Sequence, residues 1–216
     1  MTPRWRAAVR RAVPLPVRRL VGFEAKGTAS IALWLTGRRH GVPPGAVAVG
    51  YSKAQTALQV TFLVLSVAEL VAMELLLRTF GAPSGVRVPL LVVDAYGVVI
   101  GLAVVAGCVT RPHVVSAEEV RVRYGAFFDL RVPRARVVAV RRVRNLNEHG
   151  TVRVADGTLV VAVAAQTNIA LELAAPVPVV RPLGRRAEAT RIRFWADDPD
   201  AALAALRGNG VQVAVS

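Results

Sequence analysis

The sequence has 216 residues, enough for one membrane hairpin and one small soluble domain. Its formal net charge is +14, and its mean hydropathy of +0.45 is high for a soluble globular protein. The single cysteine, Cys108, excludes an intrachain disulfide. The three histidines are widely scattered along the chain, so we expect no metal site.

The first 53 residues form a basic arm with ten basic residues and one acidic residue. Residues 1–19 are rich in arginine, and no apolar core of a cleaved signal peptide follows them. Residues 20–37 carry apolar side chains at steps of three and four, which predicts an amphipathic helix. This helix would lie either in the membrane interface, with Trp34 at headgroup level, or on the soluble domain.

Two apolar stretches between residues 54 and 110 determine the class of the protein. The first runs from Leu58 to Leu77 and the second from Val88 to Thr110. Both reach the length of ~20 residues that a helix needs to cross a bilayer. Backbone polar groups in lipid must be paired within each segment, so the pattern predicts a transmembrane α-helical hairpin.

The basic residues flank the outer ends of this hairpin. Residues 54–110 carry two basic and three acidic residues, whereas residues 111–216 carry sixteen basic and ten acidic ones. The positive-inside rule then predicts that both termini are cytoplasmic. Arginine greatly outnumbers lysine, and alanine, valine and glycine are abundant, which indicates a GC-rich bacterial genome. Together with the predicted hairpin, this places the protein in a bacterial plasma membrane as a multi-pass protein. Attraction to the anionic inner leaflet explains the charge, and nucleic acid is the less favoured partner.

Small residues in the second apolar stretch indicate close helix packing. Gly97 and Gly101 form a GxxxG pattern, which lets another helix approach closely. We expect that helix to be the first apolar stretch of the same chain, and a homodimer is the alternative.

Three carboxylates lie within the apolar stretches. Glu74 precedes Arg78 by four residues, so we expect it either to snorkel outward to the interface or to pair with that arginine. Glu69 and Asp94 have no basic residue at their depth, so we expect them to be protonated or to share a proton. The functional hypothesis is proton or ion handling, and the structural one is a hydrogen bond that locks the hairpin.

After Arg111 the pattern changes to the alternation typical of β-strands. Segment 120–124 alternates valine with arginine, and Asp156-Gly157 is a strong signal for a β-hairpin. Asp198 as N-cap and Pro199 at the first helical position predict a closing helix, which Gly208 would stop. The predicted strands are 120–124, 129–132, 136–144, 152–154, 159–163, 169–173, 177–180 and 190–194.

The order of these elements resembles the bacterial pleckstrin-homology-like domain. The similarity lies in His113-Val-Val-Ser-Ala-Glu-Glu-Val-Arg-Val-Arg-Tyr-Gly-Ala-Phe-Phe128, in Val132-Pro133 followed by Val137, and in Trp195-Ala-Asp-Asp-Pro-Asp200. The resemblance implies a small β-barrel with one C-terminal capping helix, no enzymatic activity and no cofactor. The expected regions are a basic arm (1–53), a hairpin (54–110), a mostly β domain (111–208) and a tail (209–216).

Arginines of the β domain are the candidates for binding lipid phosphates or a protein partner. The alternative is that they form an ordinary solvated face. The candidates are Arg121, Arg123, Arg131, Arg134, Arg136, Arg141, Arg142 and Arg144.

No catalytic motif is visible in the sequence. We therefore expect a non-enzymatic membrane protein whose PH-like domain is a binding or scaffolding module at the inner membrane surface. The alternative function is a subunit of a transport or proton-handling complex that uses the intramembrane carboxylates.

Overall fold

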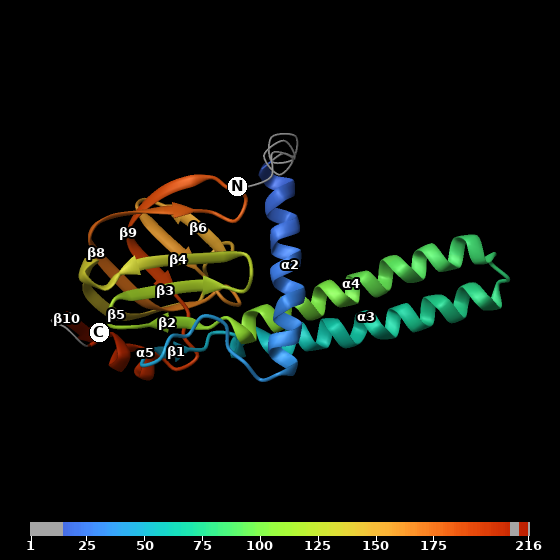
Figure 1. Ribbon diagram of the computed structural model, residues 1–216, viewed down its shortest axis with the longest axis horizontal. Coiled ribbons are helices and arrows are strands. Elements are labelled where there is room, and N and C mark those ends of the chain that lie inside the picture. Colours follow the sequence, from blue (N-terminus) through green and yellow to red (C-terminus); the bar gives the residue numbers. More distant parts are fainter. Residues whose placement is uncertain (1–14, 208–211, 216) are drawn as a thin grey trace, which may run out of the picture.

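The computed structural model describes residues 15–207 and 212–215, with side chains from residue 21 to residue 207. It consists of a helical hairpin and a mostly β domain (Figure 1). The hairpin is formed by α3 (Lys53–Thr79) and α4 (Ser84–Thr110) and projects from one end of the β domain. A further helix, α2 (Leu15–Leu35), runs crosswise over the base of the hairpin.

The two hairpin helices confirm the predicted pair of long apolar segments. In the described part of the chain, α3 and α4 are long and apolar enough to cross a membrane, by length and composition. The connection between them is short because Gly81 adopts a positive φ of 67°, which ends α3, and Pro83 precedes the first turn of α4. The side chains of α3 and of the first half of α4 are mostly exposed, whereas Ala103 and most of the following residues of α4 are buried.

The described strands are divided between two sheets. One sheet is antiparallel, with the order β1-β2-β3-β4, and the other has the order β10-β5-β8-β9-β7-β6. In the second sheet β10 is parallel to β5 and β7 is parallel to β9. The strands are β1 (Val47–Val49), β2 (His113–Val115), β3 (Glu119–Tyr124), β4 (Phe128–Pro133), β5 (Val137–Asn145), β6 (Val152–Ala155), β7 (Thr158–Val161), β8 (Thr167–Val180), β9 (Arg186–Phe194) and β10 (Gln212–Val215).

One hydrophobic core lies between the sheets. Val122 from the first sheet and Leu171 and Ile192 from the second are fully buried in it. A short 3₁₀-helix (Arg134–Arg136) links β4 to β5. The predicted closing helix is α5 (Pro199–Leu206), and its Leu203 and Leu206 complete the core.

A predicted helix cap and a predicted turn are confirmed in detail. The Asp198 side chain accepts a hydrogen bond from the Ala201 N–H over 2.9 Å, so it caps α5 as expected. The proposed stop, Gly208, lies outside the described residues. Asp156 and Gly157 both have positive φ and join β6 to β7, as the Asp-Gly pair predicts.

Two strands from outside the predicted β domain, 111–208, belong to its sheets. Strand β1 precedes the hairpin in the chain, yet it pairs with β2, with Val49 opposite His113. Strand β10 lies in the predicted tail and pairs with β5. The hairpin is therefore an insertion between two neighbouring strands of one sheet. A three-residue strand such as β1 carries too short a pattern to be recognised in a sequence.

The predicted strands 169–173 and 177–180 are parts of one long strand, β8. Its pairing with β9 shifts register between Glu172 and Val177. Strand β8 also contacts β4 of the other sheet. A small barrel remains a prediction, because the described strands belong to two sheets.

Candidate functional site

Polar and aromatic side chains gather where the hairpin joins the β domain, a region we call the junction. Four parts of the chain meet there: the start of α3, the end of α4, α2, and the turn between β3 and β4. Tyr51, just before α3, is fully buried, and its hydroxyl accepts a hydrogen bond from the Gly125 N–H over 2.6 Å. Burial raises the pKa of Tyr51 well above its ordinary value. This tyrosine therefore joins the hairpin to the β3–β4 turn as a neutral group.

Tyr124 makes a second link between the β domain and the hairpin. Its hydroxyl donates to the Oε1 atom of Gln55 in α3 over 2.9 Å, and its ring stacks on that of Tyr51 at a centroid distance of 6.0 Å. Burial raises the pKa of Tyr124 to about 12. Both tyrosines thus keep their protons and act as hydrogen-bonding groups.

His113 is completely buried behind Tyr51, with the two rings 4.6 Å apart. Its Nδ1 atom accepts the backbone N–H of Arg123, so Nε2 carries the proton and donates to the Trp195 carbonyl over 3.0 Å. Burial lowers the pKa of His113 to about 3. The imidazole is therefore neutral and has a fixed tautomer.

Arg123 is a structural residue of the junction. Its side chain is 2% exposed, and its guanidinium donates to the carbonyls of His40 (2.8 Å) and Gly41 (3.1 Å). Burial lowers the pKa of Arg123 to about 10, so it keeps its charge at neutral pH. This arginine holds the segment that links α2 to β1.

Asp197, between β9 and α5, links the C-terminal part of the β domain to the start of α3. Its carboxylate accepts the Lys53 N–H at 3.1 and 3.2 Å and the Trp195 Nε1–H at 3.2 Å. A carboxylate at the N-terminus of α3 satisfies an orphan N–H and interacts favourably with the helix dipole. The local sequence gives no sign of this cap, because 144 residues separate the partners.

Basic groups surround the point where α2 crosses α4. Arg111, just after α4, donates to Ser30 Oγ (3.1 Å) and to the Lys26 carbonyl (3.3 Å), which fastens α2 to the hairpin. Burial lowers the pKa of His40, and Arg111 and Arg123 lower it further. This side of the junction is therefore positively charged.

Asp129 supplies negative charge beside this region. Arg121 binds its carboxylate through two hydrogen bonds, one of them 2.6 Å long. Burial raises the pKa of Asp129, but the charges of Arg121 and Arg123 outweigh this effect, so the pKa lies below its ordinary value. The hydrogen bond to Asp129 in turn raises the pKa of Arg121.

The eight arginines proposed from the sequence do not form one surface. Arg121 and Arg123 belong to the junction. Arg134 is buried and donates to the Ala205 and Leu206 carbonyls at the end of α5, as a basic C-terminal cap does. Arg136 binds the Pro176 carbonyl over 3.2 Å.

The other candidates lie on exposed strand faces. Arg131 faces Glu119 at 3.8 Å, Arg141 faces Glu172 at 3.6 Å, and Arg142 binds Asp200 at 2.9 Å. Arg144 is exposed near the end of β5. Surface pairs of this kind contribute little to stability.

The intramembrane carboxylates are placed differently from one another. Glu74 binds Arg78, as predicted, and also Arg87 of α4, so it joins the two helices near the turn. Asp94 is half-buried, whereas Glu69 is exposed. Among the described residues, neither Glu69 nor Asp94 has a hydrogen bond to the other.

The two glycines of the GxxxG pattern have separate environments. A Cβ atom on Gly101 would lie 3.3 Å from Leu63 of α3, so this glycine lets the two hairpin helices approach closely. A Cβ atom on Gly97 would meet no atom within 4 Å. Only Gly101 therefore packs against the predicted partner helix.

A further glycine, Gly27, lets α2 pack on the hairpin. A Cβ atom on Gly27 would lie 3.2 Å from the Cβ of Ala103. The Phe23 ring contacts Phe127 of the β3–β4 turn at a centroid distance of 5.4 Å. Helix α2 therefore rests on the hairpin and on the β domain at once. The apolar stripe over residues 20–37 was the only sequence signal for this contact.

Within the described residues, no group of three His, Cys, Asp or Glu side chains is placed to hold a metal ion. Comparison of the chain with family models, with curated proteins and with solved structures gives no match.

Proposed function

We propose that this chain is a non-enzymatic membrane protein that displays its β domain as a binding or scaffolding module at the inner surface of a bacterial plasma membrane. The observation that carries the proposal is the insertion of the hairpin between β1 and β2, which are paired strands. An anchor built into a sheet cannot rotate freely against it, as an anchor on a flexible linker would. The module would therefore be held in one orientation to the membrane.

The position of α2 supports the placement of the hairpin in the bilayer and of the β domain at its surface. Helix α2 crosses α4 where Gly27 meets Ala103, which leaves residues 84–102 of α4 beyond the crossing. These 19 residues span about 28 Å at 1.5 Å per residue. The hydrocarbon core of a bilayer is ~30 Å thick. Helix α2 would then lie along the interface, with Trp34, which is 43% exposed, at headgroup level.

The charge pattern supports cytoplasmic termini. Arg38 and Arg39 follow α2 and are exposed, and Arg111 lies at the junction, whereas the turn between α3 and α4 is flanked only by Arg78 and Arg87. Anionic headgroups attract the basic end of such a hairpin. The partners that we propose are anionic lipids of the inner leaflet and a membrane protein.

A PH-like small barrel is the finer fold that we propose for the module. Two sheets share one core, the long strand β8 contacts β4 of the other sheet, and α5 packs on the core through Leu203 and Leu206. The order of strands and helices along the chain and these contacts support a PH-like barrel.

Cysteine labelling in intact cells tests the placement. On a Cys108→Ala background, Ser84→Cys at the hairpin turn should react with a membrane-impermeant maleimide. Ala117→Cys, in the exposed turn between β2 and β3, should react only after the cells are lysed. The reverse pattern would overturn the orientation, and recovery of the chain in the soluble fraction would overturn the membrane anchor.

A further inference from the structure

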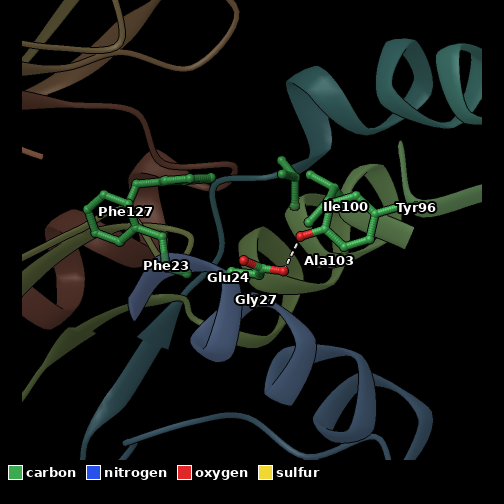
Figure 2. Close-up of a pocket in the computed structure, with 9 residues that line it drawn as sticks. Phe23, Glu24, Gly27, Tyr96, Ile100, Ala103 and Phe127 are labelled. Atoms are coloured by element: carbon green, nitrogen blue, oxygen red, sulfur yellow. Dashed lines mark hydrogen bonds between the residues drawn. The ribbon is translucent and has the colours of Figure 1, made fainter. Parts of the chain in front are cut away.

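A cavity of about 270 Å³ lies at the crossing of α2 and α4, beneath the β3–β4 turn (Figure 2). Three separate parts of the chain form its walls. The lining residues are Phe23, Glu24, Gly27, Tyr96, Ile100, Ala103, Val104, Ala126 and Phe127.

The walls are apolar apart from one polar pair. The Tyr96 hydroxyl donates to Glu24 Oε1, so α2 and α4 are joined by a hydrogen bond at the cavity (Figure 2). The remaining lining side chains are hydrocarbon or aromatic, and such a space favours an apolar occupant over water.

The cavity continues the membrane-facing surface of α4. Tyr96 and Ile100 lie on the part of α4 that we place in the bilayer, and Val92 and Val99 beside them are exposed. Ala126 and Phe127, on the opposite wall, belong to the β domain. A lipid tail next to α4 could therefore enter the cavity without leaving an apolar environment.

A basic group lies where the phosphate of such a lipid would be. A second depression shares Phe23, Ala126 and Phe127 with the cavity and includes Lys26 and Asp129. Arg121 neutralises Asp129 by its ion pair, and Lys26 is exposed. An ammonium group beside an apolar cavity matches a phosphate above an acyl chain.

We propose that the cavity binds one acyl chain of a membrane phospholipid, with the phosphate near Lys26. The proposal rests on the membrane placement given above. The bound acyl chain would contact α2, α4 and the β domain together. These contacts would help to fix the orientation of the β domain relative to the bilayer.

Photo-crosslinking of the full chain tests this site. The protein is reconstituted in nanodiscs of phosphatidylethanolamine and phosphatidylglycerol that contain a phosphatidylglycerol with a diazirine midway along one acyl chain. After illumination and trypsin digestion, mass spectrometry should find the lipid on peptide 124–131, which contains Ala126 and Phe127. A tail in the bulk bilayer would not reach this turn of the β domain.

Two matched variants give the controls. Val104→Phe fills the cavity and should remove the label from peptide 124–131, whereas Val99→Phe adds the same ring on the outer face of α4 and should leave it. Labelling of the hairpin should persist in both variants.

The outcomes distinguish a failure of the proposed lipid site from a failure of the proposed membrane placement. Label on the hairpin but not on peptide 124–131, or label on that peptide that survives Val104→Phe, would overturn the lipid site alone. The absence of label from both regions would overturn the membrane placement. Lys26→Ala should reduce labelling of peptide 124–131 by the phosphatidylglycerol probe, and equal labelling would exclude the headgroup contact.

Discussion

His113 shows how the interior fixes the state of a single titratable group. Both ring nitrogens are hydrogen-bonded, one as an acceptor from Arg123 N–H and one as a donor to the Trp195 carbonyl. A second proton on the ring would leave it charged in a fully buried site and would destroy the bond from Arg123. The folded protein therefore excludes the protonated form.

We predict that acidification destabilises the protein through His113. In the folded protein the pKa of His113 is about 3, whereas its ordinary value is 6.5. Below pH 6.5 the unfolded chain therefore binds a proton on this imidazole that the folded protein does not bind, and the free energy of unfolding decreases as the pH falls. Between pH 7 and pH 5 the loss from this residue should be about 2 kcal/mol. Thermal unfolding of the full chain in detergent should show a smaller acid shift for His113→Gln than for the parent. The exposed His149→Gln is the control, and equal shifts in all three proteins would contradict the assignment.

Two alanines adopt a conformation that suits glycine. Ala164 and Ala165 have φ values of 48° and 58°, and Val163 and Gln166 exchange two backbone hydrogen bonds around them. The turn therefore needs left-handed residues at both central positions, which costs ~1–2 kcal/mol for each residue other than glycine.

We predict that Ala165→Gly stabilises the protein, because glycine removes this cost at a small entropic penalty. The midpoint of thermal unfolding in detergent should rise. Ala117→Gly, at an exposed position without a positive φ, is the matched control and should leave the midpoint unchanged or lower it. A fall of the midpoint in Ala165→Gly would show that the turn is not strained.

Among the secondary-structure elements, α4 lies in two different environments. Its first part is exposed along the hairpin, whereas Val105, Ala106, Cys108 and Thr110 are buried against the rest of the protein. The hairpin is joined at its turn end by Glu74 with Arg78 and Arg87, and at its base by the junction. Glu69 and Asp94 lie between these two ends.

We predict that Glu69 and Asp94 are energetically independent, because one is exposed and the other half-buried with no bond between them. A double-mutant cycle of Glu69→Leu and Asp94→Leu, measured by unfolding in mixed micelles, should give a coupling within the ~0.3–0.5 kcal/mol seen for independent sites. The cycle of Glu74→Leu and Arg87→Leu should give a clear coupling and is the positive control. A larger coupling between Glu69 and Asp94 would favour a shared proton.

At the scale of the whole molecule, the β domain is completed by residues from both sides of the hairpin. Strand β1 and Tyr51 come from the chain before α3, and they cover β2 and His113. Residues 111–216 alone would expose the edge of β2 and lose a buried ring.

We predict that a chain in which residues 42–52 are joined to 111–216 by a short Gly-Ser linker folds without the hairpin. Residues 111–216 alone should be less stable by at least the ~3 kcal/mol typical of a deleted buried aromatic side chain. Urea unfolding followed by circular dichroism compares the two, with Tyr51→Ala in the longer chain as an intermediate case. Equal stability would show that β1 and Tyr51 are dispensable.

Elements with local signals were predictable from the amino-acid sequence. The apolar length of α3 and α4, the Asp198 cap of α5 and the Asp156-Gly157 turn each depend on residues that are neighbours in the chain. The Glu74–Arg78 pair was predictable for the same reason, since one turn of helix brings positions four apart together.

The residues that make up the domain and the junction became clear only from contacts between distant segments. Arg123 in an alternating strand and Arg134 after a strand look like surface charges, yet distant backbone carbonyls at Gly41 and Leu206 hold them inside. The role of β1 and the cavity between Phe23, Tyr96 and Phe127 likewise depend on contacts between remote segments. Such contacts are set by the packing of the whole chain. The pattern of charge or hydropathy along the sequence does not indicate which distant residue will form the hydrogen bonds of a given buried polar group.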